Sequence, residues 1–242
     1  ANIDTLFITT SCNADFNVAR LERYLAMCAA SGCLPLVILT KADQCDDPTD
    51  YVKQAEKLSP LLSAIAINAT DVEDVQRLNP WCRDGQTLAL VGSSGVGKTT
   101  IQNRLTDFTD TTQDIRADDA KGRHTTTNRN LRATIAGGWL IDTPGMRELR
   151  LVDAEAGVEE VFGDITELAA ACKFNDCAHA TEPGCAVRRA IEACDLDADR
   201  LERWRKLEKE NRFNTATVGK NRGHLKRLQK MYDEGLLMKM EI

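Results

Sequence analysis

Along the chain before residue 155, short uninterrupted apolar runs alternate with segments of helical spacing. The runs lack the alternation of a half-exposed strand, so they predict strands that are buried on both faces. These strands are expected at IDTLFITT (3–10), LPLVILT (34–40), SAIAINA (63–69), TLALVG (87–92), ATIAG (133–137) and GWLID (138–142). Helices are predicted over residues 18–30, ending at Gly32, and over 48–58, with Pro48 at the start. Alternating strands and helices indicate an α/β fold, with a mostly parallel sheet and helices on both faces.

The pattern changes near residue 155. Downstream, the sequence has helical spacing without strand-like runs, and a group of cysteines and a histidine interrupts it. We therefore predict two domains, an α/β domain over residues 1–154 and a small helical domain over residues 155–242.

Composition, the first residues and the number of cysteines indicate the cellular compartment of the protein. Of the 242 residues, 43% are hydrophobic and 28% are charged, as in an ordinary soluble protein. No run approaches the roughly 18 apolar residues of a membrane span. The opening segment ANIDTLFITTS lacks the basic start and cleavage site of a signal peptide, and without an initiator Met it is expected to follow further residues. Nine scattered cysteines, an odd number, favour reduced thiols and therefore a cytoplasmic protein. We also expect a monomer.

The charge is unevenly spread. The whole chain carries −6, but residues 200–230 hold eleven Lys/Arg and three acidic residues, which leaves −14 on the remainder. This basic arm, with few aromatic residues beyond Trp204 and Phe213, suits contacts to a phosphate backbone rather than to bases. Its basic residues include Arg203, Arg205, Lys206, Lys209, Arg212, Lys220, Arg222, Lys226, Arg227 and Lys230.

A phosphate-loop motif occupies residues 92–99. The sequence GSSGVGKT matches G-x-x-x-x-G-K-[ST] at every fixed position, between a predicted strand and a helical segment. Glycines let backbone N–H groups turn toward a phosphate, Lys98 would neutralise the β/γ oxygens, and Thr99 would bind Mg²⁺. The nucleotide-binding residues expected here are Gly92, Ser93, Ser94, Gly95, Val96, Gly97, Lys98, Thr99 and Thr100.

Two downstream segments fit the same site. The last predicted strand ends in DTPG (142–145), where the Asp142 carboxylate suits the shell around Mg²⁺ and Gly145 can offer a backbone N–H to the γ-phosphate. The polar segment GRHTTT (122–127) between the two motifs is expected to be the switch, with Thr126 as a second Mg²⁺ ligand.

A base-reading motif precedes the phosphate loop. The tetrapeptide Thr40-Lys41-Ala42-Asp43 ends a predicted buried strand, and Asn68-Ala69 ends the next one. The Asp43 carboxylate can accept both N–H groups on one edge of guanine, and the stem of Lys41 can cover the base. Thr40, Asn68 and Ala69 complete the expected guanine contacts. A Ras-like chain carries the phosphate loop first, so the reversed order indicates a circularly permuted GTPase.

A compact group of ligand-type residues stands in the second predicted domain. Cys172, Cys177, His179 and Cys185 follow the spacing C-x₄-C-x-H-x₅-C, and Gly184 eases the turn. Three thiolates and an imidazole suit tetrahedral Zn²⁺ in a closed structural site. The remaining cysteines show no such grouping and are expected to be core thiols.

The motif order, with GSSGVGKTT, GRHTTT, DTPGMRE and the Cys/His cluster, closely resembles the ribosome small-subunit-dependent GTPase A family. The resemblance implies a GTPase that acts late in maturation of the small ribosomal subunit, binds its rRNA and is stimulated by it. It also implies an N-terminal OB-fold, which these residues do not contain. The family carries Asn or Thr at the position of Thr40, and Thr lacks the amide that Asn would use around the base.

Met146 follows DTPG, where Ras-like enzymes place a water-orienting Gln. Because Met cannot polarise water, the catalytic group must come from elsewhere, and the resemblance implies His124. Two other functions fit the phosphate loop, namely a P-loop kinase and a non-enzymatic RNA-binding module ordered by nucleotide. The kinase leaves the base motif Thr40–Asp43 unexplained.

Overall fold

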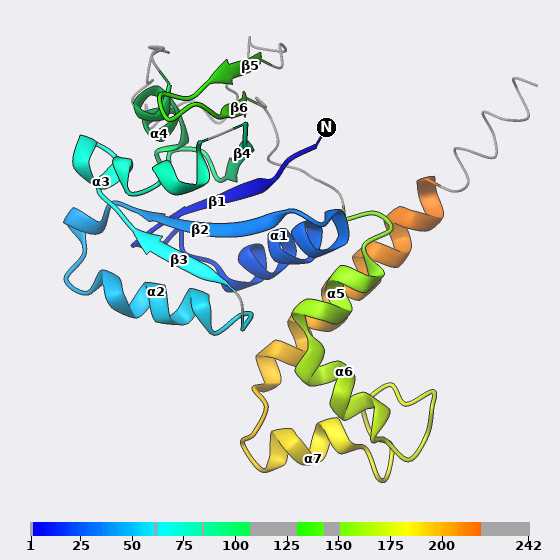
Figure 1. Cartoon of the computed structure of the whole chain (residues 1–242). Helices are drawn as coiled ribbons and strands as arrows, with labels where there is room; N and C mark the ends of the chain where they lie inside the picture. The colour runs from blue at the N-terminus through cyan, green and yellow to red at the C-terminus, as the bar shows by residue number, and fades with distance from the viewer. Residues whose placement is uncertain (1, 61, 84, 107–129, 143–150, 219–242) are drawn as a thin grey trace, which may run out of the picture. The chain divides into compact units, whose positions relative to one another are not determined.

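A computed structural model describes residues 2–60, 62–83, 85–106, 130–142 and 151–218 (Figure 1). The chain divides into two compact units, Ala1–Leu149 and Arg150–Ile242. The domain limits inferred from the sequence, 1–154 and 155–242, stay a prediction.

The first unit contains a mixed sheet, whose described strands run in the order β3-β2-β1-β4-β6-β5. Their bounds are β1 (Thr5–Ser11), β2 (Leu34–Thr40), β3 (Ser63–Ala66), β4 (Thr87–Gly92), β5 (Asn130–Ala133) and β6 (Trp139–Asp142). Every neighbouring pair is parallel except β5 and β6, which are antiparallel. The predicted, mostly parallel sheet is confirmed.

Helices cover both faces of this sheet. In Figure 1, α1 (Val18–Ser31) and α2 (Pro48–Glu56) lie on one face, and α3 (Val72–Gln76) and α4 (Lys98–Leu105) lie on the other. The described residues of the unit also form two short 3₁₀ turns, η1 (Ala42–Gln44) and η2 (Asn79–Trp81). Local signals set the helix ends, because the Asn17 and Asp47 side chains cap α1 and α2 and left-handed Gly32 ends α1.

The apolar runs are buried on both sides, as expected for central parallel strands. Residues 36–39 of β2 are each fully buried. On the face of α3 and α4, strand and helix side chains form one core cluster that includes Phe7, Leu36, Ile38, Val75, Leu88, Leu90, Ile101, Leu105 and Leu140. This core fixes the phosphate-loop strand β4 against the helix that follows it.

One predicted strand is misplaced. The strand expected over 133–137 lies at 130–133, and the next residues form the turn into β6. Thr134 N–H donates to the Gly138 carbonyl at 2.8 Å, its hydroxyl accepts from Gly138 N–H at 2.9 Å, and Gly137 adopts a φ of 101°. The apolar run Ala-Thr-Ile-Ala predicted a strand here, because the groups that form the turn are only the Thr hydroxyl and the two adjacent glycines.

Within its described residues, 151–218, the second unit consists of helices joined by loops, without strands. It contains α5 (Glu155–Val161), α6 (Gly163–Ala170), α7 (Ala186–Glu192) and a helix over residues 198–218, which we call the 198–218 helix. Phe162 and Ile165 form part of its buried interior. Arg200 binds Asp164 at 2.7 Å and lies over the Phe162 ring at 4.8 Å, so the 198–218 helix is fastened to the α5–α6 junction.

Among the residues that the structure describes, no helix has the length and apolar character needed to cross a membrane.

Candidate nucleotide-binding and metal sites

The predicted nucleotide segments leave the sheet at one edge. Because β2, β3, β4 and β6 are parallel, their carboxyl ends point the same way. The base segments follow β2 and β3, the phosphate loop follows β4, and Asp142 ends β6 next to β4 (Figure 1). Ligands of open α/β sheets bind at this carboxyl edge.

The phosphate loop depends on its glycines. Gly92, Gly95 and Gly97 adopt φ angles of 138°, 76° and 89°, which disfavour any side chain. A Cβ on Gly92 would lie 2.0 Å from the Thr9 carbonyl oxygen in the neighbouring strand. Lys98 starts α4 and turns its ammonium back over the loop, 3.0 Å from the Gly92 carbonyl and in contact with that of Ser93. The loop thus has the shape that lets N–H groups surround a phosphate at the start of a helix.

Thr40 connects the first base segment to the phosphate loop. Its side chain is buried, and its hydroxyl lies 2.7 Å from the Val96 carbonyl oxygen and 3.1 Å from that of Thr10. A Cβ on Gly97 would lie 3.6 Å from both the Thr40 methyl and the Ala69 Cβ, so all three residues are neighbours. The hydroxyl is engaged with backbone, and its predicted contact to nucleotide stays a prediction.

The two base segments also meet each other. Ala42 N–H donates to the Ile67 carbonyl at 3.3 Å, and Lys41 adopts a left-handed φ of 58° that turns the chain into η1. Asp43 lies exposed in η1. The Asn68 side chain accepts from Thr70 N–H at 2.9 Å and from the Thr70 hydroxyl at 2.7 Å, so it shapes its own loop.

Several predicted site residues are exposed on the loop or lie beyond the described part. Ser94 and Gly95 are exposed on the loop, and Thr99 is exposed in the first turn of α4. The structure gives the backbone position of Asp142, as the last residue of β6, but not the surroundings of its side chain. His124, Thr126 and Gly145 lie outside the described residues, so their predicted roles stay predictions.

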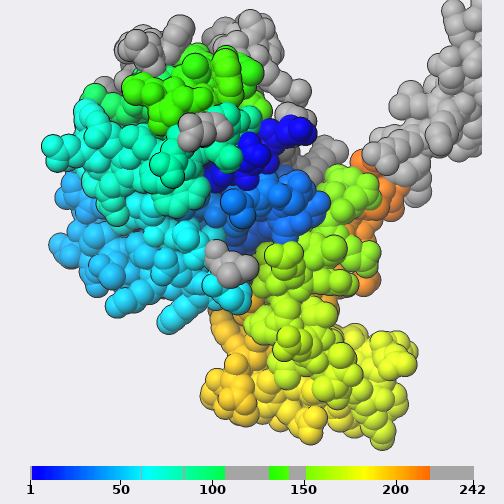
Figure 2. All heavy atoms as spheres, in the orientation of Figure 1, coloured from blue at the N-terminus to red at the C-terminus, as the bar shows by residue number. Residues whose placement is uncertain are grey.

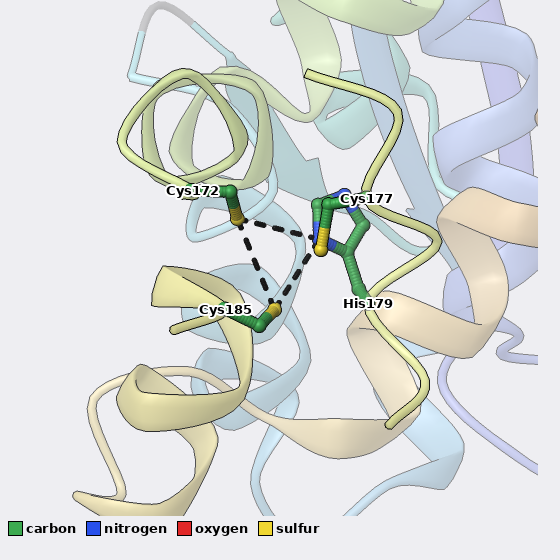
Figure 3. A group of neighbouring side chains, drawn as sticks. All are labelled: Cys172, Cys177, His179 and Cys185. Carbon is green, nitrogen blue, oxygen red and sulfur yellow. Dashed lines mark hydrogen bonds between the residues drawn. The ribbon is translucent and has the colours of Figure 1, made fainter. Parts of the chain in front are cut away.

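The four predicted metal ligands gather in the second unit (Figure 3). The Cys172 and Cys185 sulfurs are 3.8 Å apart, and His179 Nδ1 lies 3.6 Å and 3.4 Å from them. All four ligand atoms, including Cys177 Sγ, lie within 4.8 Å of one another. With metal bonds of about 2.3 Å to sulfur and 2.0–2.1 Å to nitrogen, a tetrahedron has edges of about 3.8 Å and 3.6 Å. The cluster therefore fits one tetrahedral metal ion.

The electrostatics of the cluster suit metal binding. Burial lowers the pKa of His179, and the nearby Arg205 guanidinium lowers it further, which favours the neutral imidazole that ligates metals. Burial raises the pKa of Cys172, but backbone N–H donors from Ala186 and Val187, together with hydrogen bonds from the Cys185 and Cys177 side chains, outweigh it, so the pKa is lowered overall. The Ala186 N–H lies 3.3 Å from the Cys172 sulfur. These donors favour a thiolate, the form that binds metal.

The ligand loop is held from two sides. The Glu182 carboxylate accepts hydrogen bonds of 2.8–3.1 Å from the N–H groups of Ala178, Ala180 and Thr181. From the 198–218 helix, Arg205 donates to the carbonyls of Ala178 and His179, both at 2.9 Å. The space-filling view shows the loop, drawn yellow-green, at the surface (Figure 2). Contacts of this kind orient metal ligands from outside the coordination shell.

The basic arm has two kinds of residue in its described part. Arg203 lies 3.8 Å from Asp197, and Arg205 binds Glu202 at 2.6 Å besides the metal loop, so these two serve the unit itself. Lys206, Lys209 and Arg212 are exposed, and Arg212 also binds Glu208 one turn away at 2.6 Å. The other predicted arm residues lie outside the described part, namely Lys220, Arg222, Lys226, Arg227 and Lys230.

Comparison with known families matches residues 1–152 to the model of the RsgA GTPase. The chain belongs to the RsgA GTPase family. The small ribosomal subunit biogenesis GTPase RsgA of Mesorhizobium japonicum is 52% identical over 227 residues, which cover 92% of this chain and 66% of the relative. RsgA 2 of Vibrio parahaemolyticus, with the same description, is 49% identical over 232 residues, 96% of this chain and 65% of the relative. The chain thus spans about two thirds of these relatives' length.

Solved structures show the same fold. YjeQ from Thermotoga maritima matches 85% of this chain and 70% of its own, with a TM-score of 0.60 and 23% identity. YloQ, described as a circularly permuted GTPase, matches 88% of this chain and 70% of its own, with a TM-score of 0.61 and 24% identity. The permuted GTPase fold predicted from motif order is confirmed.

The structure adds residues that the sequence did not single out. Thr9 receives the close approach of Gly92, while Glu182 and Arg205 hold the metal loop. Arg205 appeared only as part of a basic run, because nothing in its local sequence distinguishes it from an exposed arginine. Glu182 carried a weak signal, as an acidic residue inside the ligand spacing.

The contact between Thr40 and the phosphate loop is testable with an isosteric change. Thr40→Val removes the hydroxyl and leaves the Val96 carbonyl without that donor. We expect the free energy of unfolding to fall by about 1–3 kcal/mol, the effect of an unsatisfied buried group. Guanine nucleotide affinity should fall as well, because the loop loses its support. Denaturant unfolding and nucleotide titration measure the two effects. Thr40→Ser, which keeps the hydroxyl, should resemble the wild type, and equal behaviour of all three proteins would contradict this role.

Proposed function

We propose that this chain binds GTP with Mg²⁺ and hydrolyses it to GDP and phosphate during maturation of the small ribosomal subunit. The observation that carries the proposal is the hydrogen bond from Thr40 to Val96, which joins a guanine-type base motif to a phosphate loop. Membership of the RsgA GTPase family supports it, as do relatives described as small ribosomal subunit biogenesis GTPases. A factor of this kind would work in the cytoplasm, as a monomer.

In this proposal, different segments at the carboxyl edge of the sheet bind different parts of the nucleotide. Asp43 accepts from the guanine N–H groups, and the Lys41 stem covers the base. Asn68 and Ala69 line the base pocket from the next strand. Loop N–H groups and the Lys98 ammonium hold the β- and γ-phosphates, with the Gly145 N–H at the γ-phosphate. Bound Mg²⁺, held by Thr99 and Thr126 with Asp142 nearby, would neutralise charge developing on the phosphates.

Hydrolysis requires a group that positions water. In the reaction, water attacks the γ-phosphorus in line, the bond to the β–γ bridging oxygen breaks, and GDP and phosphate leave. Met146 has no polar group to orient that water. We assign the role to His124 in the switch segment, whose imidazole can orient the water or share its proton. Turnover by the free protein should therefore be slow, and docking on the ribosomal subunit should raise it.

The metal in the second unit is proposed to be Zn²⁺. Three thiolates and one imidazole at tetrahedral spacing are the donors that Zn²⁺ prefers. The protein supplies all four ligands, so no position is left for a substrate. Its role would be structural, because it joins the α6 end, the ligand loop and the start of α7.

The proposed partner is the rRNA of the small subunit. Exposed Lys206, Lys209 and Arg212 give the 198–218 helix a basic surface, which the sequence extends to Lys230. Such a surface contacts phosphates without reading sequence and weakens as salt rises.

Base selection should depend on Asp43. Asp43→Asn replaces an acceptor by a group that can donate, which suits the C2 carbonyl of xanthine. We expect GTP affinity to fall at least about tenfold, since a hydrogen bond to a charged group contributes about 1.5–3 kcal/mol, and XTP affinity to rise. Calorimetric titration with both nucleotides measures this. Asp46→Asn, an exposed neighbour, is the matched control. Unchanged GTP affinity in Asp43→Asn would remove Asp43 from the base site.

Stimulated hydrolysis should depend on His124. His124→Ala should bind GTP normally but lose about 10²–10⁴-fold of the turnover stimulated by small ribosomal subunits, the usual contribution of a positioned acid–base group. Phosphate release with and without subunits provides the measurement. In the wild type, high salt should weaken stimulation by screening the basic arm. Stimulated turnover at the wild-type rate in His124→Ala would refute the assignment, and no turnover in either protein would refute the GTPase itself.

The metal should stabilise the second unit. The purified protein should hold about one Zn²⁺ per chain, and Cys177→Ala should lower both zinc content and thermal stability, because metal binding energy is folding energy for such a loop. In a unit of this size, each 1 kcal/mol lost lowers the midpoint by roughly 4–8 °C. Elemental analysis and thermal unfolding provide the readouts, with exposed Cys194→Ala as the control. An ordered second unit in zinc-free protein would contradict the structural role.

A further inference from the structure

Two cysteines outside the metal cluster meet where α1 ends. Cys28 lies in the last turn of the helix, and Cys33 lies just past the terminating Gly32. Gly32 N–H donates to the Ala29 carbonyl at 3.3 Å, and Cys33 N–H donates to the Cys28 carbonyl at 3.2 Å. These two bonds define a Schellman motif, in which the residue after the glycine packs against the residue five positions earlier. In this chain both of those residues are cysteines.

The two cysteines are in contact but their side chains differ in access to solvent. Cys28 is 1% exposed, whereas Cys33 is half-buried. The Cys33 sulfur lies 3.9 Å from the Cys28 carbonyl oxygen and 3.3 Å from the Ser31 hydroxyl. A small molecule can therefore reach the Cys33 side chain, whereas the Cys28 side chain is shielded from solvent.

The environment also makes the two thiols chemically different. A side-chain hydrogen bond from Cys28 lowers the pKa of Cys33, and the same contact, with burial, raises the pKa of Cys28. The thiolate is the form that attacks disulfides, so Cys33 is the more nucleophilic of the two in neutral solution. An accessible thiolate beside a protected thiol is the arrangement of cysteines that react reversibly with oxidants.

We propose that Cys33 is a site of reversible thiol modification by small-molecule disulfides, with Cys28 as the resolving thiol. The Cys33 thiolate attacks a disulfide RSSR, forming a mixed disulfide Cys33–S–SR and releasing one thiolate RS⁻, which takes up a proton. Cys28 then loses its proton and attacks the Cys33 sulfur, which forms the Cys28–Cys33 disulfide and releases a second RSH. Both cysteines are oxidised, and RSSR is reduced to two thiols.

The other described cysteines are placed differently. Cys172, Cys177 and Cys185 belong to the metal cluster, and Cys82 is buried. The half-buried Cys45 lies near Cys12, whose pKa is raised by burial and by Cys45. Cys194 is exposed, so it can form a mixed disulfide but has no resolving partner in the structure described. This site is independent of the proposed GTPase activity, since it lies at the amino end of β2, opposite the base segment.

The experiment uses the full chain purified with its metal and treated with oxidised glutathione. After acid quenching and alkylation, trypsin cuts after Arg23 and Lys41 and releases residues 24–41, which contain Cys28 and Cys33 and no other cysteine. Cleavage after Arg189 and Arg200 releases residues 190–200, whose single cysteine is Cys194. Mass spectrometry should show the first peptide closed by an internal disulfide and the second carrying glutathione.

Variants separate the two steps. In Cys28→Ser, the internal disulfide should be lost completely and a glutathione adduct on Cys33 should take its place. In Cys33→Ser, which replaces the half-buried cysteine, the buried Cys28 should stay unmodified. If Cys28→Ser does not fold, the wild type and Cys33→Ser still decide the matter. The proposal is overturned if wild-type residues 24–41 stay reduced while Cys194 is modified, or if a glutathione adduct persists there without ring closure.

Discussion

The hydrogen bond between Thr40 and the Val96 carbonyl joins two segments that lie 56 residues apart in the chain. The segment after β2 is fixed to the phosphate loop, and Gly97 is a close neighbour of both Thr40 and Ala69, since a Cβ there would lie 3.6 Å from each. A site that binds a base at one end and phosphates at the other needs a constant distance between these segments. This contact supplies that constraint within the protein, before any nucleotide is present.

Strand pairing explains why the reversed order of motifs still brings the predicted site segments together. Strand pairing, and not chain order, places segments beside one another in a sheet. The phosphate-loop strand β4 lies between β1 and β6, so the base segments reach it from one side and Asp142 from the other. Because every one of these strands is parallel, their functional ends coincide at a single edge. A permuted chain therefore builds the same edge from differently connected strands.

The second unit uses another kind of long-range support. Its ligand loop contains the four candidate metal ligands within fourteen positions of sequence, and the loop's backbone is held by the 198–218 helix through Arg205. The left-handed φ of 57° at His179, uncommon for a residue with a side chain, is kept in place by this bond and by Glu182. The charge of Arg205 thus serves the metal loop, whereas its neighbours Lys206 and Lys209 face solvent.

The sequence alone determined most of the strands with continuous apolar runs, the end of α1 at Gly32, the start of α2 at Pro48, the phosphate-loop motif and the Cys/His group. These features are local, since burial pattern, glycine spacing and ligand spacing are all written within a few residues. The turn at 134–137 was missed because the segment is mostly apolar, whereas the turn is formed by the Thr134 hydroxyl and the two glycines at 137 and 138. Only the tertiary structure decided that Thr40 supports the phosphate loop and that Arg205 holds the loop of the Cys/His cluster. Each depends on where a side chain points after the chain has folded, and neighbouring sequence does not encode that direction.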